Sequence, residues 1–292
     1  MKKTTRREAL KHIAAGSLIA GAAPLLSSYT PTSKPDATLK GNIHHSVCRW
    51  TFNFQTVDEL CQTVKNIGFS AIDLAGPRDW PILQQHGVFS SMCNGAEISL
   101  TEGWNDPQYH STLLKKYTDH IELVAKAGYK NLICFSGSRR GMDDETGLKN
   151  CAEGLKKLMS LAEKSGVIIQ MELLNSKVDH KDYMCDKTPW GVELCKRIGS
   201  PNFKLLYDIY HMQIDEGDVI RTLRDNHAYI GHYHTGGVPG RHIIDESQEL
   251  YYPAIIKAIL ATGYTGYVAQ EFIPTSGDKV AELKKAVAIC DV

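Results

Sequence analysis

The sequence predicts an α/β fold built as a single (β/α)8 TIM barrel. Eight apolar, strand-like runs alternate with helical segments from residue 42 to the end of the 292-residue chain. Eight such units in about 250 residues match the size of this barrel. An open sheet of the nucleotide-binding kind is less favoured, because no G-x-G-x-x-G follows the first strand and no G-x-x-x-x-G-K-S/T is present.

The apolar runs define the predicted elements in order. Strands one to eight are expected at 43–48, 70–75, 88–92, 131–136, 167–174, 203–212, 230–235 and 266–273. Segments with the apolar spacing of helices lie at 57–67, 113–127, 147–165, 191–198, 219–226, 253–261 and 279–289, with a short one at 80–85. Several of these segments end at a glycine, for example Gly68 and Gly166, as helices commonly do.

The charge balance argues against a nucleic-acid partner. The chain has 33 basic and 33 acidic residues and a formal net charge of zero, whereas nucleic-acid binders usually show a basic face. No apolar run of about 18 residues follows the N-terminal segment, so we expect no membrane span in the mature protein. The sequence leaves the oligomeric state open and is compatible with a homo-oligomer.

Residues 1–30 have the layout of an export signal. A basic start containing Arg6 and Arg7 precedes a small, moderately apolar stretch at 13–26. The arginine pair resembles a twin-arginine signal, although Ala9 stands where such signals usually carry Phe. We therefore expect a signal at 1–30, a linker at 31–41 and the barrel at 42–292, with the mature protein in the periplasm. An amphipathic N-terminal helix or a membrane anchor is the alternative.

The eight cysteines are expected to be mostly free thiols. An even number in an exported chain is compatible with disulfides, but none falls in a C-x-x-C pattern. Cys48, Cys93 and Cys134 lie in apolar, strand-like runs, where cysteine behaves as a small buried hydrophobe. The resemblance to a twin-arginine signal also implies folding in the reducing cytoplasm before export.

Four consecutive strands in the second half end in ionisable residues. The C-terminal strand ends of a (β/α)8 barrel meet at its active-site face. Burying a carboxylate in an apolar strand is costly unless it is paired or binds a metal. Three carboxylates and one imidazole suit one divalent ion, Mn²⁺, Mg²⁺, Co²⁺ or Zn²⁺. His232 alternates with His234 and is expected to face the helices. The predicted metal ligands are Glu172, Asp208, His234 and Glu271.

The segment from Tyr207 to Gln213, YDIYHMQ, resembles a motif of hydroxypyruvate isomerases. With the pattern over residues 43–290, it makes the chain similar to the xylose isomerase-like barrel superfamily, and within it to hydroxypyruvate isomerases and ketose 3-epimerases. The resemblance implies that the ionisable residues ending strands five to eight bind one divalent metal. His234 is the ligand type of the 3-epimerases at strand seven, where hydroxypyruvate isomerases typically have Gln, and this leaves the substrate open.

The residue types favour proton transfer beside a carbonyl group. A divalent metal can hold the carbonyl and a neighbouring hydroxyl of a keto acid or keto sugar and stabilise an enediolate. One carboxylate can take the proton and a second can return it. The resemblance gives these catalytic roles to Glu172 and Glu271. His211 and Arg241 are candidates for binding substrate oxygens, since a guanidinium donates several hydrogen bonds.

The leading hypothesis is therefore an exported isomerase of the hydroxypyruvate isomerase type. A ketose 3-epimerase or another sugar-processing barrel enzyme is the alternative. An endonuclease IV-like enzyme would need a richer metal set and a basic face, which the sequence does not show. The alternative of another class is a sugar-binding barrel without turnover. Trp50 and Phe52, after the first strand, either line the substrate pocket or pack beneath a lid.

Overall fold

The computed structural model describes residues 38–292, which contain all eight predicted strands. The predicted export signal and most of the predicted linker lie outside the described residues. Most strands are shorter than the apolar runs that predicted them. They are β1 His44–Cys48, β2 Ala71–Asp73, β3 Phe89–Ser90, β4 Asn131–Cys134, β5 Ile168–Glu172, β6 Phe203–Asp208, β7 Ile230–Thr235 and β8 Tyr267–Gln270.

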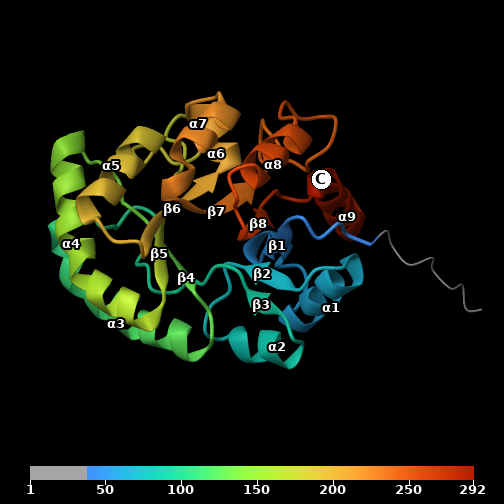
Figure 1. The fold of residues 1–292 in the computed structure, drawn as a ribbon, viewed down its shortest axis with the longest axis horizontal. Coiled ribbons are helices and arrows are strands. Elements are labelled where there is room, and N and C mark those ends of the chain that lie inside the picture. The colour runs from blue at the N-terminus through green and yellow to red at the C-terminus, as the bar shows by residue number, and fades with distance from the viewer. Residues whose placement is uncertain (1–37) are drawn as a thin grey trace, which may run out of the picture. The chain divides into compact units, whose positions relative to one another are not determined.

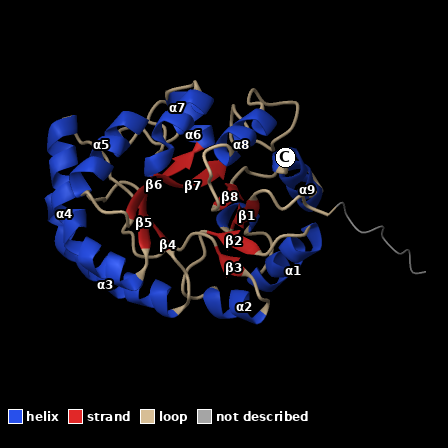
Figure 2. Cartoon of the chain, in the orientation of Figure 1, coloured by secondary structure: helices blue, strands red, loops and turns tan. Residues whose placement is uncertain are grey.

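The strands are parallel and form one closed ring. Their order in the sheet is β3-β2-β1-β8-β7-β6-β5-β4. Between β3 and β4 the ring closes through Cys93, which pairs with Leu132 of β4. Figures 1 and 2 show the strands at the centre, with helices around them. The structure thus confirms the predicted (β/α)8 barrel.

Helices form the outer layer. They are α1 Val57–Ile67, α2 Trp80–Gln85, α3 His110–Lys126, α4 Asp144–Ser165, α5 Thr188–Ile198, α6 Ile209–Asp215, α7 Val219–Asn226, α8 Tyr252–Leu260 and α9 Lys279–Cys290. Short 3-10 helices occur at Trp50–Phe52 (η1), Pro107–Tyr109 (η2) and His227–Tyr229 (η3). Within residues 38–292, none of these helices has the length and apolar character needed to cross a membrane.

Helix α1 illustrates how the local sequence sets these boundaries. The Thr56 side chain accepts a hydrogen bond from the backbone N–H of Glu59, and the Glu59 side chain accepts one from the backbone N–H of Thr56. This reciprocal capping box satisfies two N–H groups that a helix start otherwise leaves unpaired. Gly68 ends the helix at a φ of 111°, which glycine adopts without steric conflict.

The core and the polar interior occupy different parts of the barrel. Apolar side chains of the strands belong to one buried cluster with those of the helices, as expected for a parallel sheet covered by helices. Polar side chains meet inside the ring instead. Asp73 of β2 contacts His232 and His234 of β7, although two strands separate β2 from β7 in the sheet. This polar interior leads to the candidate site.

The sixth strand differs from its prediction. The apolar run 203–212 predicted one strand, but β6 ends at Asp208 and α6 begins at Ile209. Asp208 Oδ1 accepts hydrogen bonds from the backbone N–H groups of Tyr210 at 2.8 Å and His211 at 3.3 Å. Asp208 therefore caps α6, and His211 lies on the first turn of a helix rather than on a strand.

Candidate active site

A cavity of about 450 Å³ lies at the C-terminal ends of the strands, the face that carries the active site in (β/α)8 enzymes. Its wall has a polar part and an apolar part. The ionisable side chains are Glu172, Asp179, His180, Tyr210, His211, Arg241 and Glu271. The apolar side chains are Trp50, Leu74, Leu100, Phe135, Leu174 and Ile273.

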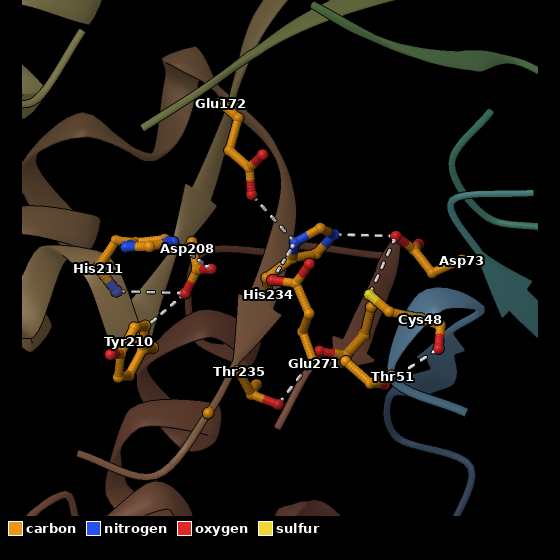
Figure 3. A network of polar contacts seen from close by, with 12 residues as sticks. Cys48, Thr51, Asp73, Glu172, Asp208, Tyr210, His211, His234, Thr235 and Glu271 are labelled. Carbon is orange, nitrogen blue, oxygen red and sulfur yellow. Dashed lines mark hydrogen bonds and ion pairs between the residues drawn. The ribbon is translucent and has the colours of Figure 1, made fainter. Parts of the chain in front are cut away.

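The four predicted metal ligands come together beside this cavity, which Glu172 and Glu271 line. Each offers one ligand atom, and these atoms lie within 4.8 Å of one another. All four residues are at most 5% exposed. Glu172 and Asp208 end β5 and β6, His234 lies in β7, and Glu271 directly follows β8. Parallel neighbouring strands thus place three carboxylates and one imidazole at one end of the ring (Figure 3).

The imidazole of His234 is held from two sides. Nδ1 lies 3.0 Å from Glu271 Oε2 and 3.3 Å from Glu172 Oε1. Nε2 lies 2.9 Å from Asp73 Oδ1, and Figure 3 shows Glu172 and Asp73 on opposite sides of the ring. Burial lowers the pKa of His234, but Glu271 and Asp73 outweigh burial and raise it well above its ordinary value. Nδ1 is therefore the nitrogen that faces the other ligand atoms.

Arg241 places a positive charge among the carboxylates. Its guanidinium donates hydrogen bonds to Glu271 Oε2 at 2.7 Å and to Asp208 Oδ2 at 3.5 Å. It also contacts Nε2 of His211 and lies over the Tyr210 ring, 4.7 Å from the ring centre. A guanidinium at this distance is attracted to the face of an aromatic ring. All six predicted site residues therefore belong to one continuous site.

The carboxyl groups of the site differ in their electrostatic surroundings. Burial raises the pKa of Glu172 above its ordinary value and that of Asp208 well above it. Burial also raises the pKa of Glu271, but His234 and Arg241 outweigh burial and hold it well below its ordinary value. The surroundings thus favour the ionised form of Glu271 more than that of Glu172. Two carboxyl groups whose pKa values are shifted in opposite directions suit acid–base chemistry.

The prediction that His232 faces the helices is wrong. Its Nε2 lies 2.8 Å from Asp73 Oδ2, and the side chain is fully buried. Residues two positions apart on a strand point to the same face of the sheet. His232 therefore points into the ring, as His234 does, and both imidazoles contact the same carboxylate.

The sequence analysis missed one residue of the site, Asp73, and left the role of another, Trp50, open. Asp73 ends β2 as Glu172 ends β5, so the signal of an acid at a strand end was present there too. For Trp50 the sequence leaves two positions open, in the pocket wall or under a lid. It lines the cavity and donates from Nε1 to Glu271 Oε1 at 2.7 Å. Phe52, named with it, is fully buried in the core.

The chain is similar in sequence to a 2-oxo-tetronate isomerase and to a sugar epimerase. A 2-oxo-tetronate isomerase of Cupriavidus necator is 36% identical over 125 residues, which cover 43% of this chain and 47% of the relative. The match thus spans about half of that relative's length. A D-psicose 3-epimerase of Ruminiclostridium cellulolyticum is 27% identical over 248 residues, which cover 76% of this chain and 80% of the relative.

Solved structures with a similar fold include an epimerase. The crystal structure of a 3-keto-D-glucoside 4-epimerase from E. coli superimposes with a TM-score of 0.70 at 19% identity, covering 84% of this chain and 98% of that one. The model of the xylose isomerase-like TIM barrel family matches residues 61–289, which is most of the chain. The chain therefore belongs to the xylose isomerase-like TIM barrel family.

Proposed function

We propose that the barrel is a metal-dependent isomerase that moves a proton beside the carbonyl group of a small keto acid or keto sugar. The observation that carries the proposal is the convergence of four buried ligand atoms within 4.8 Å at the cavity. The names of the relatives, a 2-oxo-tetronate isomerase and a D-psicose 3-epimerase, support this type of reaction.

The residues present fit one divalent ion. Three buried carboxyl groups cannot all be ionised at such short separations without a compensating positive charge. In the structure, Arg241 supplies part of that charge, because it contacts both Asp208 and Glu271. Oxygen ligands with one imidazole suit Mn²⁺, Mg²⁺, Co²⁺ or Zn²⁺. Glu172, Asp208, Glu271 and Nδ1 of His234 would hold the ion.

The two glutamates are placed for acid–base work. Both line the cavity, so each can reach a substrate carbon there. A bound divalent ion would polarise the substrate's carbonyl and stabilise the negative charge that forms when the proton leaves. We assign the base to Glu271, whose surroundings favour the ionised form that can accept a proton, and the return of the proton to Glu172. Arg241 and His211 would orient the substrate's oxygens.

Two substrate classes fit the cavity. The leading one is a 2-oxo acid of the hydroxypyruvate type, whose carboxylate would pair with Arg241. This is the only Lys or Arg side chain among the described residues that line the cavity. A ketose 3-epimerase is the second candidate, and the imidazole of His234 at the strand-seven position favours it. The longer match to the D-psicose 3-epimerase favours it as well.

Deuterium exchange tests the proposal directly. The metal-loaded protein is incubated in D2O with a panel of 2-oxo acids and ketoses, and NMR detects exchange beside the carbonyl group. We expect exchange and a rearranged product with one class. A protein that binds a sugar together with metal, but exchanges no substrate proton across the panel, would instead be a sugar-binding barrel without turnover.

We also propose that the protein is exported through the twin-arginine pathway to the periplasm. The support is the arrangement of Arg6 and Arg7 before an apolar stretch at 13–26. The double substitution Arg6→Lys and Arg7→Lys should retain the protein in the cytoplasm, as measured by fractionation of expressing cells. Unchanged export of this variant would exclude the twin-arginine route.

A further inference from the structure

We propose that Asp73 is a positioning residue that fixes the orientation and tautomer of His234, so that Nδ1 is the atom offered to the metal. The inference rests on the proposed function, because it concerns the same metal site. Asp73 itself is not among the residues that line the cavity. It would therefore act on the metal through His234 and not by touching the substrate.

The surroundings of Asp73 show a carboxylate held from several sides. It is fully buried at the end of β2. Oδ1 lies 2.9 Å from Nε2 of His234, and Oδ2 lies 2.8 Å from Nε2 of His232. The Ser91 hydroxyl donates to Oδ2 at 2.5 Å, and the Cys48 thiol lies 3.7 Å from Oδ1. Contacts on both oxygens leave the carboxylate little freedom to rotate.

This arrangement decides which nitrogen of His234 carries a proton. An ionised carboxylate only accepts hydrogen bonds, so its contact with Nε2 requires a proton on Nε2. In a neutral imidazole the lone pair is then on Nδ1, the nitrogen that faces Glu172 and Glu271. Metal-binding histidines usually donate their second N–H to a carboxylate or carbonyl, and losing that partner typically weakens metal binding about 10- to 100-fold.

The same cluster has a rival interpretation. A second set of three ligand atoms, from Asp73, His232 and His234, also lies within 4.8 Å of one another. These residues are therefore a candidate second metal site, which would share His234 with the first. Two observations favour hydrogen bonding. The Ser91 hydroxyl already donates to the oxygen that His232 contacts. None of Asp73, His232 and His234 lines the cavity, whereas Glu172 and Glu271 of the first set do, so only the first set has ligands on the open path by which an ion enters.

Mn²⁺ binding tests the inference without reference to activity. Free Mn²⁺ is followed by its EPR signal during titration of wild type, Asp73→Asn, His234→Gln and the double variant. We expect Asp73→Asn to raise the Kd about 10- to 100-fold in the wild-type background. The effect should largely vanish in the His234→Gln background, because an amide ligand has no tautomer to fix. A merely structural role predicts the same fold-change in both backgrounds, within about twofold.

A matched control and a milder variant complete the experiment. Asp291→Asn disturbs another buried Asp–His pair, in which His45 Nε2 lies 3.4 Å from Asp291 Oδ1, and it should leave the Kd unchanged. Ser91→Ala keeps the Asp73 carboxylate but removes one of its hydrogen bonds. It should weaken Mn²⁺ binding less than Asp73→Asn does, and it replaces that variant if Asp73→Asn does not fold.

The outcomes distinguish a failure of the proposed metal-dependent function from a failure of the role proposed for Asp73. A wild-type protein that binds no divalent metal contradicts the proposed function itself. One tightly bound ion with an unchanged Kd in Asp73→Asn, or in Ser91→Ala if only that variant folds, overturns the role of Asp73. Two ions per wild-type chain, of which Asp73→Asn loses one, would make the cluster a second metal site and also overturn the inference.

Discussion

The indole Nε1 of Trp50 donates a hydrogen bond to Oε1 of Glu271, and the two atoms are 2.7 Å apart. Arg241 donates to the other oxygen, Oε2, at the same distance. Trp50 begins η1, separated from the end of β1 by one residue. Strand β8, which pairs with β1, ends just before Glu271. Each oxygen of this carboxylate therefore has its own donor, which holds Glu271 in one orientation toward the cavity.

The substitution Trp50→Phe should lower kcat about 10- to 100-fold. It keeps an aromatic ring in the cavity wall but removes the N–H that holds Glu271. Hydrogen bonds to charged groups typically contribute about 1.5–3 kcal/mol, and each 1.36 kcal/mol changes a rate about tenfold. Steady-state kinetics with the substrate found in the exchange experiment measure the effect. Phe54→Leu, in an exposed aromatic residue that does not line the cavity, is the control and should be close to wild type.

Metal binding should release protons and should tighten as the pH rises. In the metal-free protein, Glu271 and Asp73 raise the pKa of His234 despite its burial, and burial raises the pKa of Asp208. Protons on these groups compete with the metal, because ligands must be deprotonated to bind. Raising the pH removes this competition and lowers the Kd. Titration calorimetry in two buffers of different ionisation enthalpy counts the protons released, and release of none would contradict the assignment of these ligands.

The eight cysteines should be slow to react in the folded protein and should all react after denaturation without reductant. All eight are buried and free in the structure, which agrees with the prediction from the sequence. Burial raises the pKa of Cys61 to about 11 and that of Cys93 to about 12, so little of the reactive thiolate is present near neutral pH. A thiol titration with and without reductant measures this. A lower count without reductant would reveal disulfides.

The strand–helix rhythm predicted the barrel because a parallel strand buried on both faces gives a continuous apolar run. A continuous apolar run also gives no sign of where β6 ends and α6 begins. Ile209 and Met212 are buried, and short apolar runs do not distinguish a strand from a buried helix. The signal that could have found the boundary was Asp208, a residue type that often caps helices.

The candidate site was only partly predictable from the sequence. Acids at successive strand ends converge by the geometry of the fold, so Glu172 and Glu271 could be found in this way. The same rule extended to the first half of the chain would have found Asp73. The hydrogen bond from Trp50 joins residues 221 positions apart and depends on side-chain orientation, which no spacing in the sequence indicates.

The substitutions Glu172→Gln and Glu271→Gln should each lower turnover far more than they weaken substrate binding. The amide keeps the shape of the side chain and still offers one oxygen to a metal, but it cannot take up a proton near neutral pH. Acid–base catalysis by a positioned side chain is typically worth about 10²- to 10⁴-fold, and we expect kcat to fall by that amount. Metal content is measured for each variant, so that loss of the ion is not mistaken for loss of proton transfer.

Exchange in D2O should separate the two glutamates. If Glu271 removes the proton and Glu172 returns it, Glu271→Gln abolishes exchange from the forward substrate, whereas Glu172→Gln retains it. His211→Ala and Arg241→Ala serve as the comparison. Their expected contacts with substrate oxygens also exist in the ground state, so part of their effect should appear in KM. A Glu271→Gln protein that keeps its metal and turns over at a near-normal rate would show that the two-carboxylate mechanism is wrong. The proton would then be removed without the carboxylate that this mechanism requires as its base.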